Sequence, residues 1–243
     1  ASLHWLQGWQ KAHWDITPKD LAPLRKPAAG LFPQGELANS PTQPLATIAQ
    51  ELFGLPEGEL IIGDMNTNHL IRFLPDDVNG STQGTLIPFI AGGELGIGNF
   101  RLDFAPDGTL WVGKIHLGWA GDEGLLKIEK TDKDMFIVEK VNLLKDGFQI
   151  TFNHALNDLP KQLDVSRHGY HYHAAYGSEK VELSKVKAMN IELSHQNKVL
   201  KIQLPDLVEG QLYTIDLTGV TDTNNQPLMG HVLRYQLNNE IKR

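Results

Sequence analysis

Three histidines lie close together in the second half of the chain, at His168, His171 and His173. Because alternate residues of a strand point to the same side, a strand here would present His171 and His173 together, with His168 or Tyr170 nearby. Imidazole nitrogens bind d-block metal ions, which need three or four ligands. The spacing therefore predicts a candidate metal site. The structural alternative is a half-exposed sheet face of aromatic and imidazole side chains.

A second set of polar residues has the chemistry to bind an anion. Four of its members fall at corresponding places in two copies of an internal repeat, and an indole that could stack on a ligand follows the second copy. Arginine suits this role because its planar guanidinium pairs with a carboxylate through two hydrogen bonds. The predicted cofactor- or substrate-binding residues are His69, Arg72, Arg101, His116 and Trp119.

The two arginines have a structural alternative. Arginines in repeated β-units often form ion pairs between neighbouring units, and Asp64 and Asp103 are candidate partners here. In that case Arg72 and Arg101 would contribute to stability and not to binding.

The repeat itself predicts an architecture. Gly58 to Asp64 matches Gly108 to Lys114 position for position, at an offset of 50 residues, and each copy is a short strand after a glycine turn. Further short strands follow at His69 to Phe73 and at Leu125 to Glu129. Strand units that repeat every ~40–50 residues are typical of β-propeller blades. Two copies cannot close a ring of roughly 4–8 blades. We therefore expect another polypeptide, a longer parent protein or the N-terminal segment to cover the open edges.

The chain divides into three parts by composition. Residues 1–45 are rich in Trp and Pro without periodicity and predict an extended strap packed on another surface. Residues 46–132 contain the two predicted blades, and residues 133–243 contain short alternating strands separated by turns, as in an immunoglobulin- or fibronectin-like β-sandwich. Helix is expected only at Thr47 to Phe53 and near Pro18 to Leu21. The predicted fold is therefore all-β: a partial β-propeller of about two blades followed by a β-sandwich.

The strands expected in the sandwich share alternating apolar residues and flanking turn residues. They are Ile137 to Leu143, Phe148 to Phe152, Gly169 to His173, Lys187 to Leu193, Leu200 to Gln203, Tyr213 to Asp216 and Val232 to Leu237. Because about seven strands in ~110 residues suffice for a core, we expect this part to fold alone.

Composition excludes several classes of protein. The chain has 243 residues, a formal net charge of −7 and no cysteine. An acidic chain without basic blocks lacks the phosphate-neutralising charge that nucleic-acid binding needs, so we expect no nucleic-acid partner. No segment approaches the ~20 apolar residues of a spanning helix, so we expect no membrane span. The sequence also lacks GxSxG, P-loop and HExxH motifs.

Several stretches together resemble one family. They are Asn39 to Pro44, Gly58 to Asp64, Asn66 to Arg72, Arg101 to Gly113, Gly118 to Trp119, Gly124 to Leu125, Asp146 to Phe152, Tyr170 to Ser178 and Thr218 to Val220. These stretches resemble the C-terminal part of secreted bacterial sorbosone-dehydrogenase-like or PQQ-dependent sugar-dehydrogenase-like propellers with an appended immunoglobulin- or fibronectin-like domain. The chain departs from the family pattern at Leu117, where Arg is usual, and at Gln34, where His is usual.

The resemblance implies a function. Sugar dehydrogenases of this fold hold PQQ over a central channel beside a calcium ion, so it implies PQQ and calcium as cofactors, a sugar or other small molecule as substrate, and a secreted or periplasmic location. Two hypotheses follow. The chain is either the C-terminal portion of an enzyme that oxidises an aldose and passes electrons to an acceptor, or a non-catalytic secreted module that binds carbohydrate or protein, or that serves in assembly.

Overall fold

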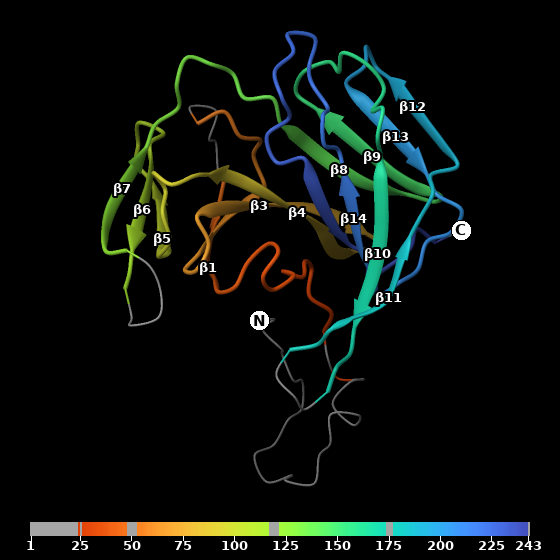
Figure 1. The fold of residues 1–243 in the computed structure, drawn as a ribbon, viewed down its shortest axis with the longest axis horizontal. Coiled ribbons are helices and arrows are strands. Elements are labelled where there is room, and N and C mark those ends of the chain that lie inside the picture. The colour runs from red at the N-terminus through yellow and green to blue at the C-terminus, as the bar shows by residue number, and fades with distance from the viewer. Residues whose placement is uncertain (1–23, 25, 48–52, 117–121, 174–176, 243) are drawn as a thin grey trace, which may run out of the picture.

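A computed structural model describes residues 24, 26–47, 53–116, 122–173 and 177–242. These residues form 15 β-strands in three antiparallel sheets, none of them closed, and contain no α-helix (Figure 1). The all-β prediction is confirmed. The helix expected at Thr47 to Phe53 lies mostly in residues 48–52, and the turn near Pro18 to Leu21 lies in residues 1–23, so both predictions fall outside the described residues.

The largest sheet has eight strands, and it draws on both ends of the chain. Its order is β1-β2-β3-β4-β15-β14-β10-β11. The strands are β1 (Pro41–Ala46), β2 (Leu60–Asp64), β3 (His69–Val78), β4 (Ser81–Ala91), β15 (Val232–Gln236), β14 (Leu212–Asp216), β10 (Asp164–Tyr170) and β11 (Lys180–Lys185).

Two smaller sheets pack against this one. The four-stranded sheet has the order β12-β13-β9-β8 and the three-stranded sheet the order β5-β6-β7. The strands are β12 (Asn190–Ser194), β13 (Val199–Gln203), β9 (Gly147–Phe152), β8 (Val138–Leu144), β5 (Asn99–Phe104), β6 (Leu110–Lys114) and β7 (Gly124–Ile128).

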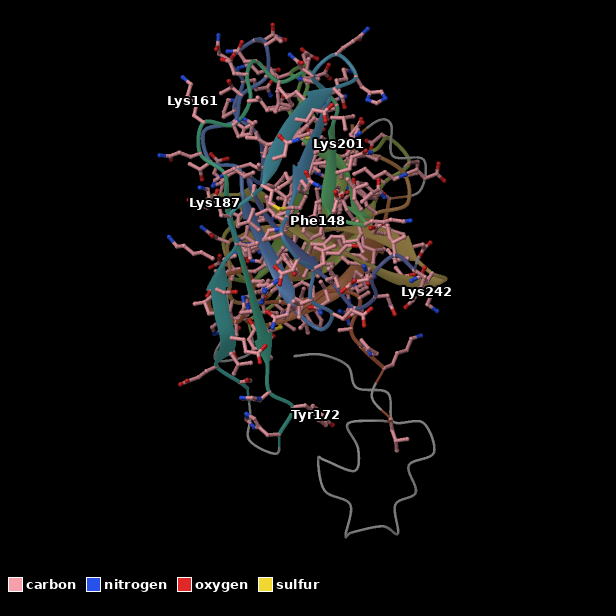
Figure 2. The ribbon with its side chains drawn as sticks, turned by 90° about the vertical axis from the view of Figure 1, so that its right-hand side faces the viewer. Phe148, Lys161, Tyr172, Lys187, Lys201 and Lys242 are labelled. Carbon is pink, nitrogen blue, oxygen red and sulfur yellow. The ribbon has the colours of Figure 1, made fainter. Side chains whose placement is uncertain are left out.

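The main core lies between the four-stranded sheet and one face of the eight-stranded sheet, as in a β-sandwich. Alternation along β9 points Phe148, Ile150 and Phe152 inward, and all three are fully buried. The ring of Phe148 lies 5.4 Å from that of Tyr213 and 5.0 Å from that of Tyr235. Figure 2 shows Phe148 in the middle of the molecule. Aromatic pairs in such orientations add to the stabilisation that burial provides.

The eight-stranded sheet is continuous across the boundary expected at residues 132 and 133. Strand β4 pairs with β15, with Leu86 opposite Arg234 and Thr85 opposite Tyr235. The sandwich core also includes Ile87 of β4, together with Leu74 and Val78 of β3. Strands from the predicted blade region therefore complete the predicted sandwich, and the two parts share one core.

Each copy of the repeat forms a turn and a strand, as the sequence indicates. The copies give β2 and β6, at the centres of two meanders, β1 to β4 and β5 to β7. The meanders pack together through a second core that includes Ile61, Leu70, Leu110 and Val112. The sheet that contains the first meander continues beyond β4, because β4 pairs with β15. No helix in the described residues is long and apolar enough to cross a membrane.

The described part of the predicted strap covers the outer face of the eight-stranded sheet. Leu37 and Ala38 pack against Ile71 and Leu86, and the side-chain amide of Asn238 donates to the carbonyl of Ala28 at 2.8 Å. Figure 1 shows this segment, in red and orange, running between β1 and the β10–β11 pair. We refer to residues 26–40 as the strap. Residues 41–46 form strand β1, where no strand was expected.

Candidate functional site

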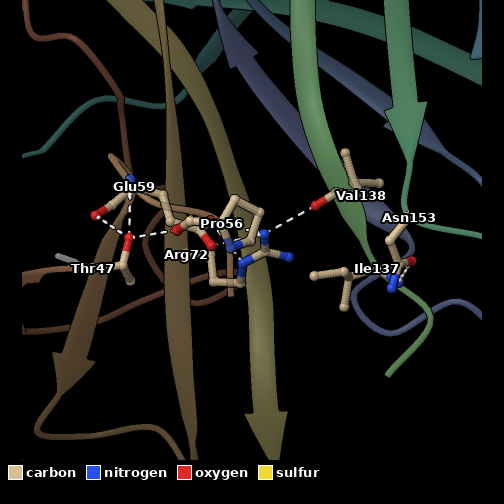
Figure 3. Close-up of polar contacts among 7 residues, drawn as sticks. All are labelled: Thr47, Pro56, Glu59, Arg72, Ile137, Val138 and Asn153. Carbon is tan, nitrogen blue, oxygen red and sulfur yellow. Dashed lines mark hydrogen bonds and ion pairs between the residues drawn. The ribbon is translucent and has the colours of Figure 1, made fainter. Parts of the chain in front are cut away.

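Arg72 lies on β3 with its guanidinium directed into the interior (Figure 3). Its side chain is 1% exposed. Nε and Nη2 donate to the carboxylate of Glu59 at 2.8 and 3.1 Å, and Nη2 also donates to the carbonyl of Val138 at 2.9 Å. The guanidinium therefore ties the turn before β2 to the start of β8.

The Arg72–Glu59 pair is sealed from water. Burial raises the pKa of Glu59 to about 7, although the positive charge of Arg72 and its hydrogen bonds to the carboxylate act in the opposite direction. Burial likewise lowers the pKa of Arg72, against the effect of Glu59. Such shifts show that desolvation opposes the charged forms, so each charge depends on its partner. Arg72 is a structural residue in this arrangement, and its partner is Glu59 and not Asp64.

Asp64 orders a turn instead. Its buried carboxylate accepts backbone N–H groups from Asn39, Ser40, Asn66 and Thr67, at 2.8 to 2.9 Å. A carboxylate with four such donors is satisfied without a cation. It holds the start of β1 against the loop between β2 and β3.

The other predicted binding residues that the structure describes lie in different parts of the fold and do not surround one site. His69 places Nε2 2.6 Å from the carbonyl oxygen of Leu37 in the strap. Arg101 is exposed on β5, with its guanidinium 3.9 Å from the centre of the Phe100 ring, and His116 is exposed beyond the end of β6. Trp119 lies outside the described residues.

These residues do not suit PQQ. An anionic cofactor with several carboxylates needs free cations that converge on it, whereas the Arg72 guanidinium is bound to Glu59 and Arg101 lies in a different sheet, over its neighbouring ring. Nor does the described part of the chain contain a group of three or more His, Asp or Glu side chains that could hold calcium or another metal.

The three histidines of the predicted metal site do not share one strand face. Strand β10 ends at Tyr170, earlier than the Gly169 to His173 strand that the sequence indicates. The His168 side chain is buried, with Nε2 3.1 Å from the hydroxyl oxygen of Tyr170, and burial together with the charge of Lys180 lowers its pKa to about 4. His171 and His173 are exposed beyond the strand. Tyr172, between them, lies below the sheets in Figure 2.

Sequence reasoning missed a different polar site, a depression of about 510 Å³ that opens to solvent at one end of the sandwich. Its lining comes from the segments that flank β8, β9 and β13 and from the turn after β14. The lining residues are Lys133, Asp134, Asn153, His154, Ala155, Lys198, Thr223, Asn224 and Gln226. We call it the His154 depression.

A buried carboxylate orients the histidine of this depression. Asp222 is fully buried and lies 2.9 Å from Nδ1 of His154. It also accepts the backbone N–H groups of Asn224 and Gln226 at 2.8 Å each. Burial alone would raise the pKa of Asp222, but these hydrogen bonds together lower it. The carboxylate is therefore ionised at neutral pH and favours a proton on Nδ1 of His154, which leaves Nε2 on the other side of the ring.

Stacking and two lysines complete the depression. The His154 ring is parallel to that of Phe136, with centroids 5.9 Å apart. Lys133 and Lys198 are exposed, and Nζ of Lys198 donates to the carbonyl of Asn153 at 2.7 Å. Two cations, an oriented imidazole and several amides can together bind a ligand with carboxylate and hydroxyl groups. The sequence indicates the turn at Asn224 and Asn225 but not its pairing with His154, because the pair is 68 positions apart.

No protein-family model matches this chain, and the comparisons with curated proteins and with solved structures also found no match.

Proposed function

We propose that this chain acts as a non-catalytic secreted binding module and takes an acidic carbohydrate at the His154 depression. The observation that supports the proposal best is the convergence of Lys133, Lys198 and the Asp222-oriented His154 on one open polar surface. Carboxylates of the sugar would form ion pairs with the two lysines, and its hydroxyls would form hydrogen bonds with Asn153 and Asn224. At an open surface, ordered waters can bridge polar groups of protein and ligand without making binding weak, which suits a hydrated ligand.

The openness of the depression is the reason for proposing binding and not catalysis. Acid–base and electrostatic catalysis gain most of their strength where water is excluded and donors are held around the reacting atoms. His154 lies at a surface that water reaches from one side. The PQQ-dependent dehydrogenase that the resemblance implies stays a prediction, and the residues assigned to it do not favour it.

Calorimetric titration with an oligogalacturonate tests the proposal, with the neutral oligomer of galactose as the matched ligand. We expect the acidic oligomer to bind the wild-type protein, and the double variant Lys133→Ala/Lys198→Ala to bind it at least about tenfold more weakly, a loss of about 1.4 kcal/mol. The control is Lys161→Ala/Lys187→Ala, which removes the same charge from two exposed positions that do not line the depression (Figure 2). Equal binding of the two oligomers, or equal loss in both double variants, would contradict the proposal.

A spectroscopic experiment separates the two functional classes. PQQ and calcium are added to the protein, and the absorbance of the cofactor and the reduction of a dye by aldoses are followed. Absence of both signals supports the binding module. A shifted cofactor spectrum with aldose-dependent dye reduction supports the dehydrogenase.

A further inference from the structure

Arg234 carries a buried positive charge on the face of the eight-stranded sheet that the strap covers. Its neighbours Leu233 and Tyr235 on β15 point into the sandwich core, so alternation directs Arg234 to the opposite face. The side chain is 8% exposed, and its Nε and Nη1 atoms are buried without a hydrogen-bond partner in the described residues. Leaving a buried charge without a partner costs several kcal/mol of folding free energy, of the order of 3–5.

The strap lies over this part of the sheet. Leu86, which is directly opposite Arg234 across the β4–β15 pair, packs against Leu37 and approaches Gly30 so closely that a Cβ there would lie 3.2 Å from its Cδ1 atom. Glu36 of the strap forms an ion pair with Lys180 of β11. These two side chains are 46% and 30% exposed, so the pair lies at the solvent-exposed edge of the contact between strap and sheet.

The described charges around Arg234 leave one positive charge uncompensated. Among the described acidic groups, Glu36 has the largest electrostatic effect on Arg234, but its own pKa is lowered first by its hydrogen bond to Lys180 and less by Arg234. Glu36 therefore neutralises Lys180. The buried His168 is neutral at pH 7, and Asp216 influences Arg234 less than Glu36 does. A ligand with a single negative charge would balance the site, whereas a doubly charged one would overcompensate it.

Two further polar atoms on this face lack partners. Gln236 follows Arg234 by two residues on β15 and therefore shares its face, and its Oε1 atom is buried without a donor in the described residues. His168 lies in the same row, with Leu212 of β14 between it and Gln236, and its Nδ1 atom is also buried without a partner. An unfilled acceptor thus accompanies the unfilled donors of Arg234.

We propose that Arg234, Gln236 and His168 form a binding site for a small monocarboxylate that carries a hydroxyl group, between the strap and the eight-stranded sheet. The carboxylate accepts from the guanidinium of Arg234, and the hydroxyl donates to Oε1 of Gln236. Nδ1 of His168 supplies a further polar contact. This site shares no residue with the His154 depression and does not depend on it.

Glycolate is the probe that tests this site, with acetate, inorganic phosphate and chloride compared at equal ionic strength. The readouts are the thermal unfolding midpoint and calorimetric titration. We expect glycolate to bind and raise the midpoint, because a ligand that binds only the folded state stabilises it. Acetate should bind about tenfold more weakly, since it leaves Gln236 without a donor. Phosphate and chloride should not raise the midpoint, and a larger rise with phosphate than with glycolate would overturn the proposal.

Substitutions test whether the stabilisation by glycolate depends on Arg234. Arg234→Met should abolish the glycolate effect, whereas Arg101→Met, which removes an exposed arginine, should retain it. Because Arg234→Met can affect folding, Gln236→Leu is the second test, and it should reduce glycolate binding to the level of acetate. Lys133→Ala/Lys198→Ala should bind glycolate as the wild type does, which separates this site from the proposed function. Equal glycolate effects in the wild type and in Arg234→Met, or no glycolate binding by the wild type, would make Arg234 a purely structural residue.

Discussion

Arg72 and Glu59 form a two-point ion pair whose side chains are 1% and 3% exposed. The pair joins the turn before β2 to β3, and through the carbonyl of Val138 it reaches the first strand of the four-stranded sheet. A guanidinium so placed joins the first meander to the four-stranded sheet of the sandwich.

We predict that Arg72→Met lowers the free energy of unfolding by about 3–5 kcal/mol, because it leaves a buried carboxylate without its cation. The double variant Arg72→Met/Glu59→Met should recover most of the loss, since neither charge then remains buried. Urea unfolding at pH 7 measures both. Arg101→Ala, at an exposed site, should change stability by less than about 0.5 kcal/mol. An unaffected Arg72→Met protein would show that the ion pair contributes nothing.

The buried His168 predicts a pH dependence. Burial lowers its pKa from 6.5 to about 4, so between these values the unfolded chain binds the proton and the folded protein does not. Stability is therefore fully present above pH 6.5 and falls as the pH drops toward 4, by up to about 3 kcal/mol.

The measurement compares urea unfolding of the wild type and His168→Gln at pH 7, 5.5 and 4.5. We expect the wild type to lose more stability than the variant over this range. Glu59, whose pKa burial raises to about 7, acts in the opposite direction but equally in both proteins, so the difference reports on His168. Parallel pH profiles would contradict the prediction.

A fragment of residues 134–243 should not fold cooperatively. It keeps β15 but loses β4, which pairs with it, and it loses Leu74, Val78 and Ile87 from the shared core. We expect a broad thermal transition and strong binding of a dye that reports exposed apolar surface. The full chain is the control. A sharp transition without dye binding would support the independent sandwich that the sequence indicates.

Asp222→Ala should lower the free energy of unfolding by about 3 kcal/mol. The variant removes the charged acceptor of the N–H groups of Asn224 and Gln226 and of Nδ1 of His154, and a hydrogen bond to a charged group contributes about 1.5–3 kcal/mol. His154→Ala removes only one of these bonds and should cost less. Thermal and urea unfolding of the two variants check the order, and a larger loss in His154→Ala would contradict it.

Local patterns predicted most of the strands. The alternation of Phe148, Ile150 and Phe152 gives β9, because a half-buried strand shows this pattern in its own residues. Strand β4 is different. Gly84 and Pro88 interrupt its apolar residues, and they are tolerated because the strand pairs along its length with β3 and, around Gly84, also with β15. The sequence carries no sign of that long-range pairing.

The candidate sites depended on pairing as well. Glu59 meets Arg72 because Ile61 lies opposite Arg72 in the β2–β3 hairpin, a register that the loop between the strands determines and that the sequence alone leaves open. His154 meets Asp222 only when the two sheets of the sandwich come together. The strand predicted from Gly169 to His173 was wrong for a similar reason. Strand β10 ends at Tyr170, which pairs with Lys180 at the start of β11, and the sequence alone does not show this pairing.

The pairing of β4 with β15 sets the order of events during synthesis. The side-chain amide of Gln83 on β4 donates a hydrogen bond to the hydroxyl of Tyr235 on β15, and the two residues are 152 positions apart in the chain. While the ribosome makes the intervening residues, β4 has no neighbour on one side, and an unpaired strand edge of this kind invites association with other chains. The ladder between the two strands closes only after β15 emerges, and closing so long a loop is slow. Native pairing of β4 therefore waits until β15 has been made, and until then the open edge exposes the nascent chain to aggregation.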